Sequence, residues 1–323
     1  MFLSGCSQLT AQAGEQIKVA ARSRAIVPLM HACSLAALAA LTALAFNAPA
    51  AAAGDTATAN ATANATAHAA PVRAITLTPH ITELIFAAGA GDRIVATVTS
   101  SDYPATALAI PRIGDGVNIS IEKALSFRPD LVVAWQASAA AVTLAPAMAR
   151  LHIPLLYSAP RSLADIPGEV RRFGALFETQ GIAETAAQEL SIRLQGLETR
   201  YAGRERVAVF MEIGANPVYT LGNDPLLNDA LRICGAHNVY ADAFIAAPQV
   251  SAESVLVAQP AVIITSAIDH EALQAATARW AALRLPAALK GHVYGIDPDK
   301  LFRPGPRLID AVEELCRYID KSR

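Results

Sequence analysis

The chain has 323 residues, of which 53% are hydrophobic and 17% charged, and its formal net charge is −2 at pH 7. This composition supports one or two substantial cores. It excludes a basic surface that follows nucleic acid, because the arginines are scattered along the chain rather than gathered in a cluster. No nucleic-acid partner is therefore expected.

The N-terminal region has the pattern of a secretion signal. Arg22 and Arg24 precede an apolar run over residues 25–46, and alanine-rich sequence follows it. We assign residues 1–53 to a signal region that is removed on export to the periplasm. A retained membrane anchor is the alternative, since the run is close to the ~20 residues that span a bilayer. Residues 54–70, almost wholly Ala, Thr and Asn, are predicted to form a disordered tether.

Apolar runs and helical periodicity alternate along the rest of the chain, which predicts α/β structure. In an N-terminal lobe over residues 71–161, we expect a strand at residues 73–77. A helix at residues 82–88 and a second strand at residues 94–98 follow. Gly89 ends the helix, where a left-handed cap residue is wanted.

Apolar side chains recur at helical spacing between residues 162 and 203, which predicts linking helices. The second of them spans about 30 Å and would act as a stiff strut between two lobes. A C-terminal lobe over residues 204–323 repeats the order of the first, with a strand at residues 207–211 and a helix at residues 225–234. Gly235 follows that helix as Gly89 follows its counterpart.

One segment is present twice, about 131 residues apart. Residues 120–133 and 251–264 both read Ser-x-Glu-x-x-Leu, then Pro and an apolar run. Each copy places a glutamate, Glu122 or Glu253, in the first turn of a helix that a serine caps. The duplication indicates two similar lobes, and two facing lobes form a cleft of the kind in which small ligands bind.

Cysteine usage agrees with an exported protein. Cys6 and Cys33 lie in the region assigned to the signal, which leaves Cys234 and Cys316 as an even pair. In an oxidising compartment such a pair is predicted to form a disulfide. Two buried free thiols are the alternative.

Six segments in a fixed order resemble the periplasmic cobalamin-binding proteins of ABC importers. These belong to the class III substrate-binding proteins, whose lobes are linked by a helical backbone. The resemblance covers nearly all of the chain from Arg73 onward. It is carried by residues 78–89 (Thr-Pro-His-Ile-Thr-Glu onward), 101–104 (Ser-Asp-Tyr-Pro), 129–135, 214–220, 248–251 and 303–307 (Arg-Pro-Gly-Pro-Arg).

The resemblance implies a fold and a function. The expected fold is two similar lobes of mostly parallel sheet with flanking helices, joined by one long α-helix, with the ligand cleft between the lobes. Members also pair cysteines that match Cys234 and Cys316. The expected function is capture of cobalamin or a related corrinoid and its delivery to an importer. We expect no catalytic residues, no catalytic cofactor and no protein-bound metal.

The same resemblance implies ligand contacts. Trp135 follows an apolar run, so it stands at the carboxyl end of a strand, where open α/β sheets bind ligands. Flat aromatic side chains suit a corrin because they provide rigid contact area at low entropic cost. His80 is a minor candidate for an axial ligand of a bound metal chelate. The expected contact residues are Tyr103, Trp135, Tyr219, Asp299, Phe302 and Arg303.

In proteins of this kind, acidic residues that match Glu122 and Glu253 meet arginines of the membrane-embedded permease dimer, which works with ATPase subunits. A monomeric two-lobed protein facing a two-fold partner needs one contact on each lobe. Charge pairs of this kind set encounter rate and register. A glutamate in a first helical turn also complements the helix dipole, but that explanation accounts less well for two equivalent copies.

Two departures bear on the ligand. Members can carry tryptophans where this chain has Gly116 and Ala247, so haem or a ferric siderophore remains an alternative cargo. A cell-envelope enzyme on a similar scaffold is a further alternative. It is disfavoured because the chain has no phosphate-binding loop, no Gly-x-Ser-x-Gly elbow and no His-Glu-x-x-His motif.

Overall fold

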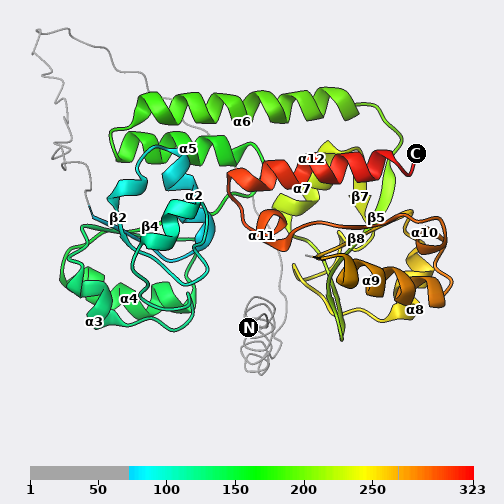
Figure 1. Cartoon of the computed structure of the whole chain (residues 1–323), viewed down its shortest axis with the longest axis horizontal. Coiled ribbons are helices and arrows are strands. Elements are labelled where there is room, and N and C mark those ends of the chain that lie inside the picture. Colours follow the sequence, from blue (N-terminus) through cyan, green and yellow to red (C-terminus); the bar gives the residue numbers. More distant parts are fainter. Residues whose placement is uncertain (1–72, 268) are drawn as a thin grey trace, which may run out of the picture. The chain divides into compact units, whose positions relative to one another are not determined.

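Two separate β-sheets, one in each lobe, form the framework of the protein (Figure 1). The computed structural model describes residues 73–267 and 269–323, which fall within one compact unit. The signal region and the tether that we predict from the sequence lie outside the described residues. Among the described residues, no helix is long and apolar enough to cross a membrane.

The N-terminal lobe contains a four-stranded parallel sheet in the order β2-β1-β3-β4. Its central strands are buried along their whole length, as a parallel sheet covered on both faces requires. The strands are β1 (Ala74–Thr76), β2 (Ile94–Ala96), β3 (Leu131–Ala134) and β4 (Leu155–Tyr157). The helices are α2 (Pro79–Ala87), η1 (Gly91–Arg93), η2 (Ala105–Ala109), α3 (Ile121–Ser126) and α4 (Ala139–Arg150).

The C-terminal lobe contains a mostly parallel sheet built around one long strand, β5 (Val207–Ala215). The first half of β5 pairs with β7 and its second half with antiparallel β6, while its other edge pairs with β8. The other strands are β6 (Val218–Thr220), β7 (Ala236–Asn238), β8 (Val262–Thr265) and β9 (Val293–Gly295). The helices are α7 (Pro225–Ile233), α8 (Ala252–Ala258), α9 (His270–Ala282), α10 (Pro286–Leu289), α11 (Pro298–Leu301) and α12 (Pro306–Asp320).

The first helices of the two lobes are built alike. Both α2 and α7 begin with a proline at the first helical position, where its missing N–H is not needed. The start of α2 expected from the sequence, Thr82, is three residues too late, because Pro79 marks the true first position of the helix. Gly89 and Gly235 follow the two helices with φ of +80° and +67°, a conformation that glycine adopts without strain.

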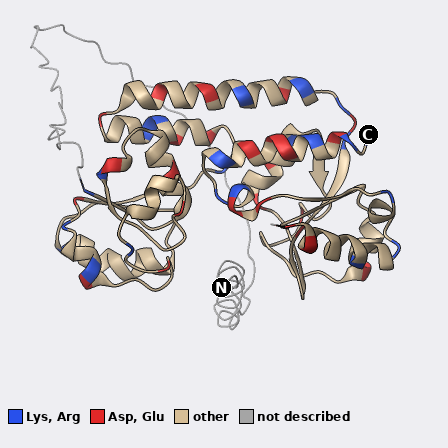
Figure 2. Cartoon of the chain, in the orientation of Figure 1, with Lys and Arg blue, Asp and Glu red and all other residues tan. Residues whose placement is uncertain are grey.

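Two antiparallel helices link the lobes, α5 (Asp165–Leu176) and α6 (Gln180–Tyr201). At 22 residues, α6 is about 33 Å long. Figure 1 shows it running alongside both α5 and α12, and contacts join it to each. Acidic and basic residues are interspersed along α6 and α12 (Figure 2). Arg193 of α6 pairs there with Asp310 at 2.6 Å and Glu313 at 2.8 Å.

The hydrophobic core reflects the alternation of side chains along each strand. In β3, Leu131 and Val133 enter the largest core cluster, while Val132 and Ala134 enter a separate cluster on the other face. In β5, Val209 joins that same largest cluster and Phe210 a third cluster within its own lobe. One face of each sheet therefore rests on a single core, which α2, α5, α6, α7 and α12 complete.

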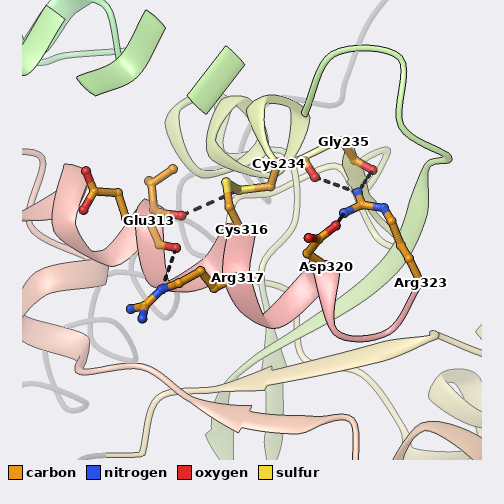
Figure 3. Close-up of a disulfide and its surroundings, with 8 residues drawn as sticks. Cys234, Gly235, Glu313, Cys316, Arg317, Asp320 and Arg323 are labelled. Carbon is orange, nitrogen blue, oxygen red and sulfur yellow. Dashed lines mark hydrogen bonds and ion pairs between the residues drawn. A yellow bond between two sulfur atoms is a disulfide. The ribbon is translucent and has the colours of Figure 1, made fainter. Parts of the chain in front are cut away.

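A disulfide closes the C-terminal lobe, as the sequence analysis predicts. It joins Cys234, at the end of α7, to Cys316 of α12, with 4.7 Å between their Cα atoms (Figure 3). Both side chains are fully buried. Arg323 secures the same corner by donating hydrogen bonds to the backbone oxygens of Cys234 at 2.8 Å and Gly235 at 3.0 Å.

Replacing both cysteines, in C234S/C316S, should lower the free energy of unfolding by about 4–5 kcal/mol, because the bridge closes a long loop in the unfolded chain. The sequence separation is 82 residues. Urea denaturation of the oxidised wild type and the variant measures the difference. Reduced wild type is the matched control and should resemble the variant, and equal midpoints for oxidised and reduced protein would contradict the expectation.

Candidate functional site

Neighbouring strands of the N-terminal lobe end at a group of polar and aromatic side chains. Strands β1 and β3 are parallel and pair Thr76 with Val133, so their carboxyl ends lie side by side. His80 comes shortly after β1, and Trp135 directly follows β3. Their rings meet edge to face, with centroids 5.6 Å apart. This edge of an open α/β sheet is the usual place for a ligand.

His80 is buried and has one free ring nitrogen. Its side chain is 2% exposed and bonds to the backbone of Ser158. The Ser158 N–H already donates to Ala134, so the imidazole donates to the Ser158 oxygen. Because Nε2 has no partner, Nδ1 carries the proton and Nε2 keeps its lone pair. Burial lowers the pKa of His80 to about 3, so the ring is neutral at physiological pH.

Two hydroxyl groups at the same strand ends are also without partners. Thr78 and Ser138 occupy the N-cap positions of α2 and α4, yet neither side chain caps its helix. Their oxygens are buried and lack hydrogen bonds, like Nε2 of His80. Buried polar atoms are normally satisfied by protein or water. The carboxyl edge of β1 and β3 therefore has unused hydrogen-bonding capacity.

Ionic contacts join the lobes next to this edge. Glu83 of α2 has a side chain only 1% exposed, and Arg307 of α12 donates to both of its oxygens, at 2.9 and 2.6 Å. Arg303 approaches the same carboxylate at 3.7 Å. Burial raises the pKa of the Glu83 carboxyl above its ordinary value, although Arg307 acts in the opposite direction. A buried carboxylate is costly without such partners.

A second part of this network involves Asp102, in the loop before Tyr103. Arg303 donates to Asp102 at 2.6 Å and to Asp299 of α11 at 2.7 Å. Partial burial acts to raise the pKa of Asp102, but the hydrogen bond and charge of Arg303 outweigh it and hold that pKa below its ordinary value. The side chain of Arg303 is only 10% exposed. It is thus engaged within the protein rather than free at a surface.

Tyr103 is held by α12, through Arg307. The residue is 47% exposed, and the guanidinium of Arg307 lies 4.2 Å from the ring centre. The structure therefore connects three of the predicted contact residues, Tyr103, Asp299 and Arg303, through Asp102 and Arg307. Glu83, Asp102 and Arg307 are not among the site residues expected from the sequence. The available signal was that Asp102 and Arg307 lie inside the two motifs that supplied Tyr103 and Arg303.

The remaining predicted contact residues do not join this network through any contact that we observe among the described residues. Tyr219 is half-buried on β6 and pairs with Gln249. Phe302 ends α11 and packs partly against the main core. Within the described part of the chain, no group of three or more His, Cys, Asp or Glu side chains is placed to hold a metal ion.

Glu122 and Glu253 have the same local structure. Each is exposed and follows a serine N-cap, whose oxygen accepts from the N–H of Lys123 at 3.1 Å or of Ser254 at 3.2 Å. Hydrogen bonds from its own backbone and from Ser251 lower the pKa of Glu253. In both copies of the segment, the residue before the proline has a positive φ, 44° at Arg128 and 45° at Gln259.

Comparison with known proteins agrees with this architecture. Residues 75–300 match the sequence pattern of the periplasmic binding proteins. The chain belongs to the periplasmic binding protein family. A vitamin B12-binding protein of Vibrio cholerae is 35% identical to it over 247 residues, which are 76% of this chain and 88% of the relative.

Solved structures of other periplasmic binding proteins have the same fold. The periplasmic vitamin B12-binding protein BtuF of Vibrio cholerae has a TM-score of 0.72 at 35% identity, with 78% of this chain and 98% of BtuF covered. The periplasmic heme-binding protein RhuT of Roseiflexus sp. RS-1 has a TM-score of 0.67 at 25% identity, with 78% and 99% covered. The fold expected from the sequence, two α/β lobes joined by a long helix, is confirmed.

The buried imidazole predicts a pH dependence of stability. His80 stays neutral in the folded protein down to about pH 3, whereas in the unfolded chain it takes up a proton near its ordinary value of 6.5. Its contribution to stability is therefore present above pH 6.5 and is lost as the pH falls toward 3. Between pH 7.5 and pH 5, we expect a loss of about 2 kcal/mol from this residue.

Urea denaturation of wild type and His80→Gln at several pH values tests this expectation. The variant should show a smaller decrease in unfolding free energy on acidification, whatever its stability at neutral pH. The exposed His152 provides the control, because His152→Gln should keep the wild-type slope. Equal slopes for wild type and His80→Gln would exclude the buried neutral imidazole.

Proposed function

We propose that this periplasmic binding protein is exported to the periplasm by an N-terminal signal peptide and captures cobalamin or a related corrinoid between its lobes. It then delivers the corrinoid to the permease dimer of an ABC importer, without catalysing a reaction. For the lobes and their connection, we propose the limits 71–161, 162–203 and 204–323. The observation that carries the proposal is the similarity to vitamin B12-binding proteins, because it spans both lobes at 35% identity.

The chemistry of the site supports a large, mostly apolar ring as the ligand. Tyr103 and Trp135 both stand near the carboxyl edge of the N-terminal sheet, and Tyr103 has nearly half of its surface exposed. Rigid rings of this kind provide contact area with little loss of side-chain entropy. We assign Tyr219, Phe302, Asp299 and Arg303 to the opposite side of the same ligand. Arg303 would act there mainly by keeping Asp102 and Asp299 in place.

Haem is the second candidate, and two observations favour it. His80 offers a neutral imidazole whose Nε2 lone pair is free, which an axial metal ligand requires. Gly116 replaces a possible tryptophan, and a Cβ at that position would lie 3.6 Å from the Leu77 oxygen, next to β1. With φ of +93°, this backbone disfavours any larger residue, so the site is wider there. The similarity to a heme-binding protein is in line with this alternative.

Purified protein should bind cyanocobalamin with micromolar or lower Kd, and more tightly than hemin. Tyr103→Ala and Trp135→Ala should each weaken binding about ten-fold, since a lost aromatic contact removes roughly 1–1.5 kcal/mol. Titration with cyanocobalamin, dicyanocobinamide and hemin, followed by intrinsic fluorescence, measures these constants.

Tyr318→Ala serves as the matched control. This ring lies about 16 Å along α12 from Arg307 and stacks on Tyr294, so its loss should leave the Kd unchanged. Absence of corrinoid binding at micromolar concentration, or tighter binding of hemin, would overturn the cargo assignment.

The paired glutamates support docking to a two-fold partner. Glu122→Ala/Glu253→Ala should retain the wild-type Kd for ligand but lose most of the stimulation of the importer's ATPase, since in this proposal each charge meets an arginine of the permease. Each single variant should have an intermediate effect. The measurement is ATP hydrolysis by the importer in proteoliposomes over a range of binding-protein concentrations.

Glu189→Ala is the control, because this exposed glutamate lies on α6 and outside both copies of the repeat. Full stimulation by the double variant would show that the two glutamates serve only their helices.

A further inference from the structure

Arg307 occupies an unusual position for a cation. It is the second residue of α12, and no acidic side chain lies in the first turn of that helix. A positive charge at a helix N-terminus opposes the helix dipole, so Arg307 does not stabilise its own helix. Its favourable contacts lie in the other lobe, with Glu83 on one side and Tyr103 on the other.

The bond to Glu83 fixes the plane of the guanidinium. Both Glu83 oxygens accept from Arg307, through Nε and Nη2, so the group is held at two points rather than one. Bidentate pairs of this kind define geometry as well as charge. The carboxylate is almost fully buried, at 1% exposure, and cannot turn toward solvent. The guanidinium is therefore a fixed surface against which another planar group can pack.

The ring of Tyr103 is that planar group. Its loop is anchored separately, because Asp102 binds Arg303 and the Ser101 oxygen accepts from Arg112 at 2.8 Å. These contacts fix the backbone but not the rotation of the ring. The guanidinium of Arg307, 4.2 Å from the ring centre, lies over one face of the ring, and 47% of the residue remains exposed.

We propose that Arg307 is a positioning residue for ligand binding: held by Glu83, it fixes the ring of Tyr103 so that the free part of the ring receives a flat apolar ligand. This inference rests on the proposed function, since it gives Tyr103 its role at the ligand. The two arginines of α12 and its preceding turn then have separate tasks. Arg303 secures the loop that carries Tyr103, and Arg307 secures the ring.

Arg307→Lys tests the proposal. Lysine keeps the charge near Glu83 but lacks the planar fork that both pairs with the carboxylate and stacks on the ring. The Kd for cyanocobalamin should rise about five-fold, the effect of losing a partly exposed cation–π contact that orders the ring. Arg193→Lys is the matched control, because Arg193 also pairs with two carboxylates but has no tyrosine against it. That control should bind like wild type.

A double-mutant cycle separates positioning from a merely structural role. If Arg307 acts through Tyr103, Arg307→Lys should add nothing to the loss caused by Tyr103→Ala. An equal five-fold effect in both backgrounds would mean that Arg307 only holds the lobes together, and would overturn the proposal. An unchanged Kd in the Arg307→Lys single variant would overturn it as well.

A ligand-free measurement keeps the inference distinct from the choice of cargo. Protein labelled with 3-fluorotyrosine gives a ¹⁹F resonance for Tyr103, which Tyr103→Phe identifies. In Arg307→Lys that resonance should shift and change width, and in Arg193→Lys it should not. If the wild type binds no chelate, the proposed function fails, whereas an unchanged Tyr103 resonance in Arg307→Lys overturns the positioning of the ring.

Discussion

The arrangement of the two lobes depends on a buried carboxylate. Glu83 lies in the first helix of the N-terminal lobe, and both cations that neutralise it come from the far end of the chain. An unpaired carboxylate in that place would be strongly unfavourable. The pairing of Glu83 therefore keeps the N-terminus of α12 next to α2. It keeps the turn that carries Arg303 there as well. The placement of the Asp102 loop and of the Tyr103 ring depends on the two arginines of this contact.

The hydrophobic core also holds the two lobes together. Strands of both lobes and the helices α5, α6 and α12 contribute to a single buried cluster, so the lobes share one of their cores. Separating them would expose apolar surface as well as the Glu83 carboxylate. The stiff strut that the sequence predicts between the lobes thus has a stronger physical basis than the length of the linking helix alone. The connection is rigid because it is part of the core.

Local patterns predicted much of this structure, and long-range pairing was beyond their reach. Apolar alternation located the strands, and glycines located the ends of α2 and α7, because these signals act within a few residues. The repeat predicted two equivalent glutamates, and the parity of the cysteines predicted the disulfide. Glu83 and Arg307 are 224 positions apart, and nothing in either neighbourhood indicates the other. Arg303 was predicted as a ligand contact, whereas its position within three ion pairs follows only from the tertiary structure.

The two ends of α12 are attached to the protein in different ways. Cys316 lies near the carboxyl end of a helix whose amino end holds Glu83 in the other lobe. One end is thus covalently fixed in the C-terminal lobe, whereas the other combines ionic contacts with the buried side chains of Leu308 and Ile309. A force that separates the lobes would be transmitted along α12 and would act on the ionic and apolar contacts of its amino end rather than on the disulfide. The junction would therefore yield first at the residues that hold Tyr103, so that pulling the lobes apart also loosens the surface on which the ligand rests.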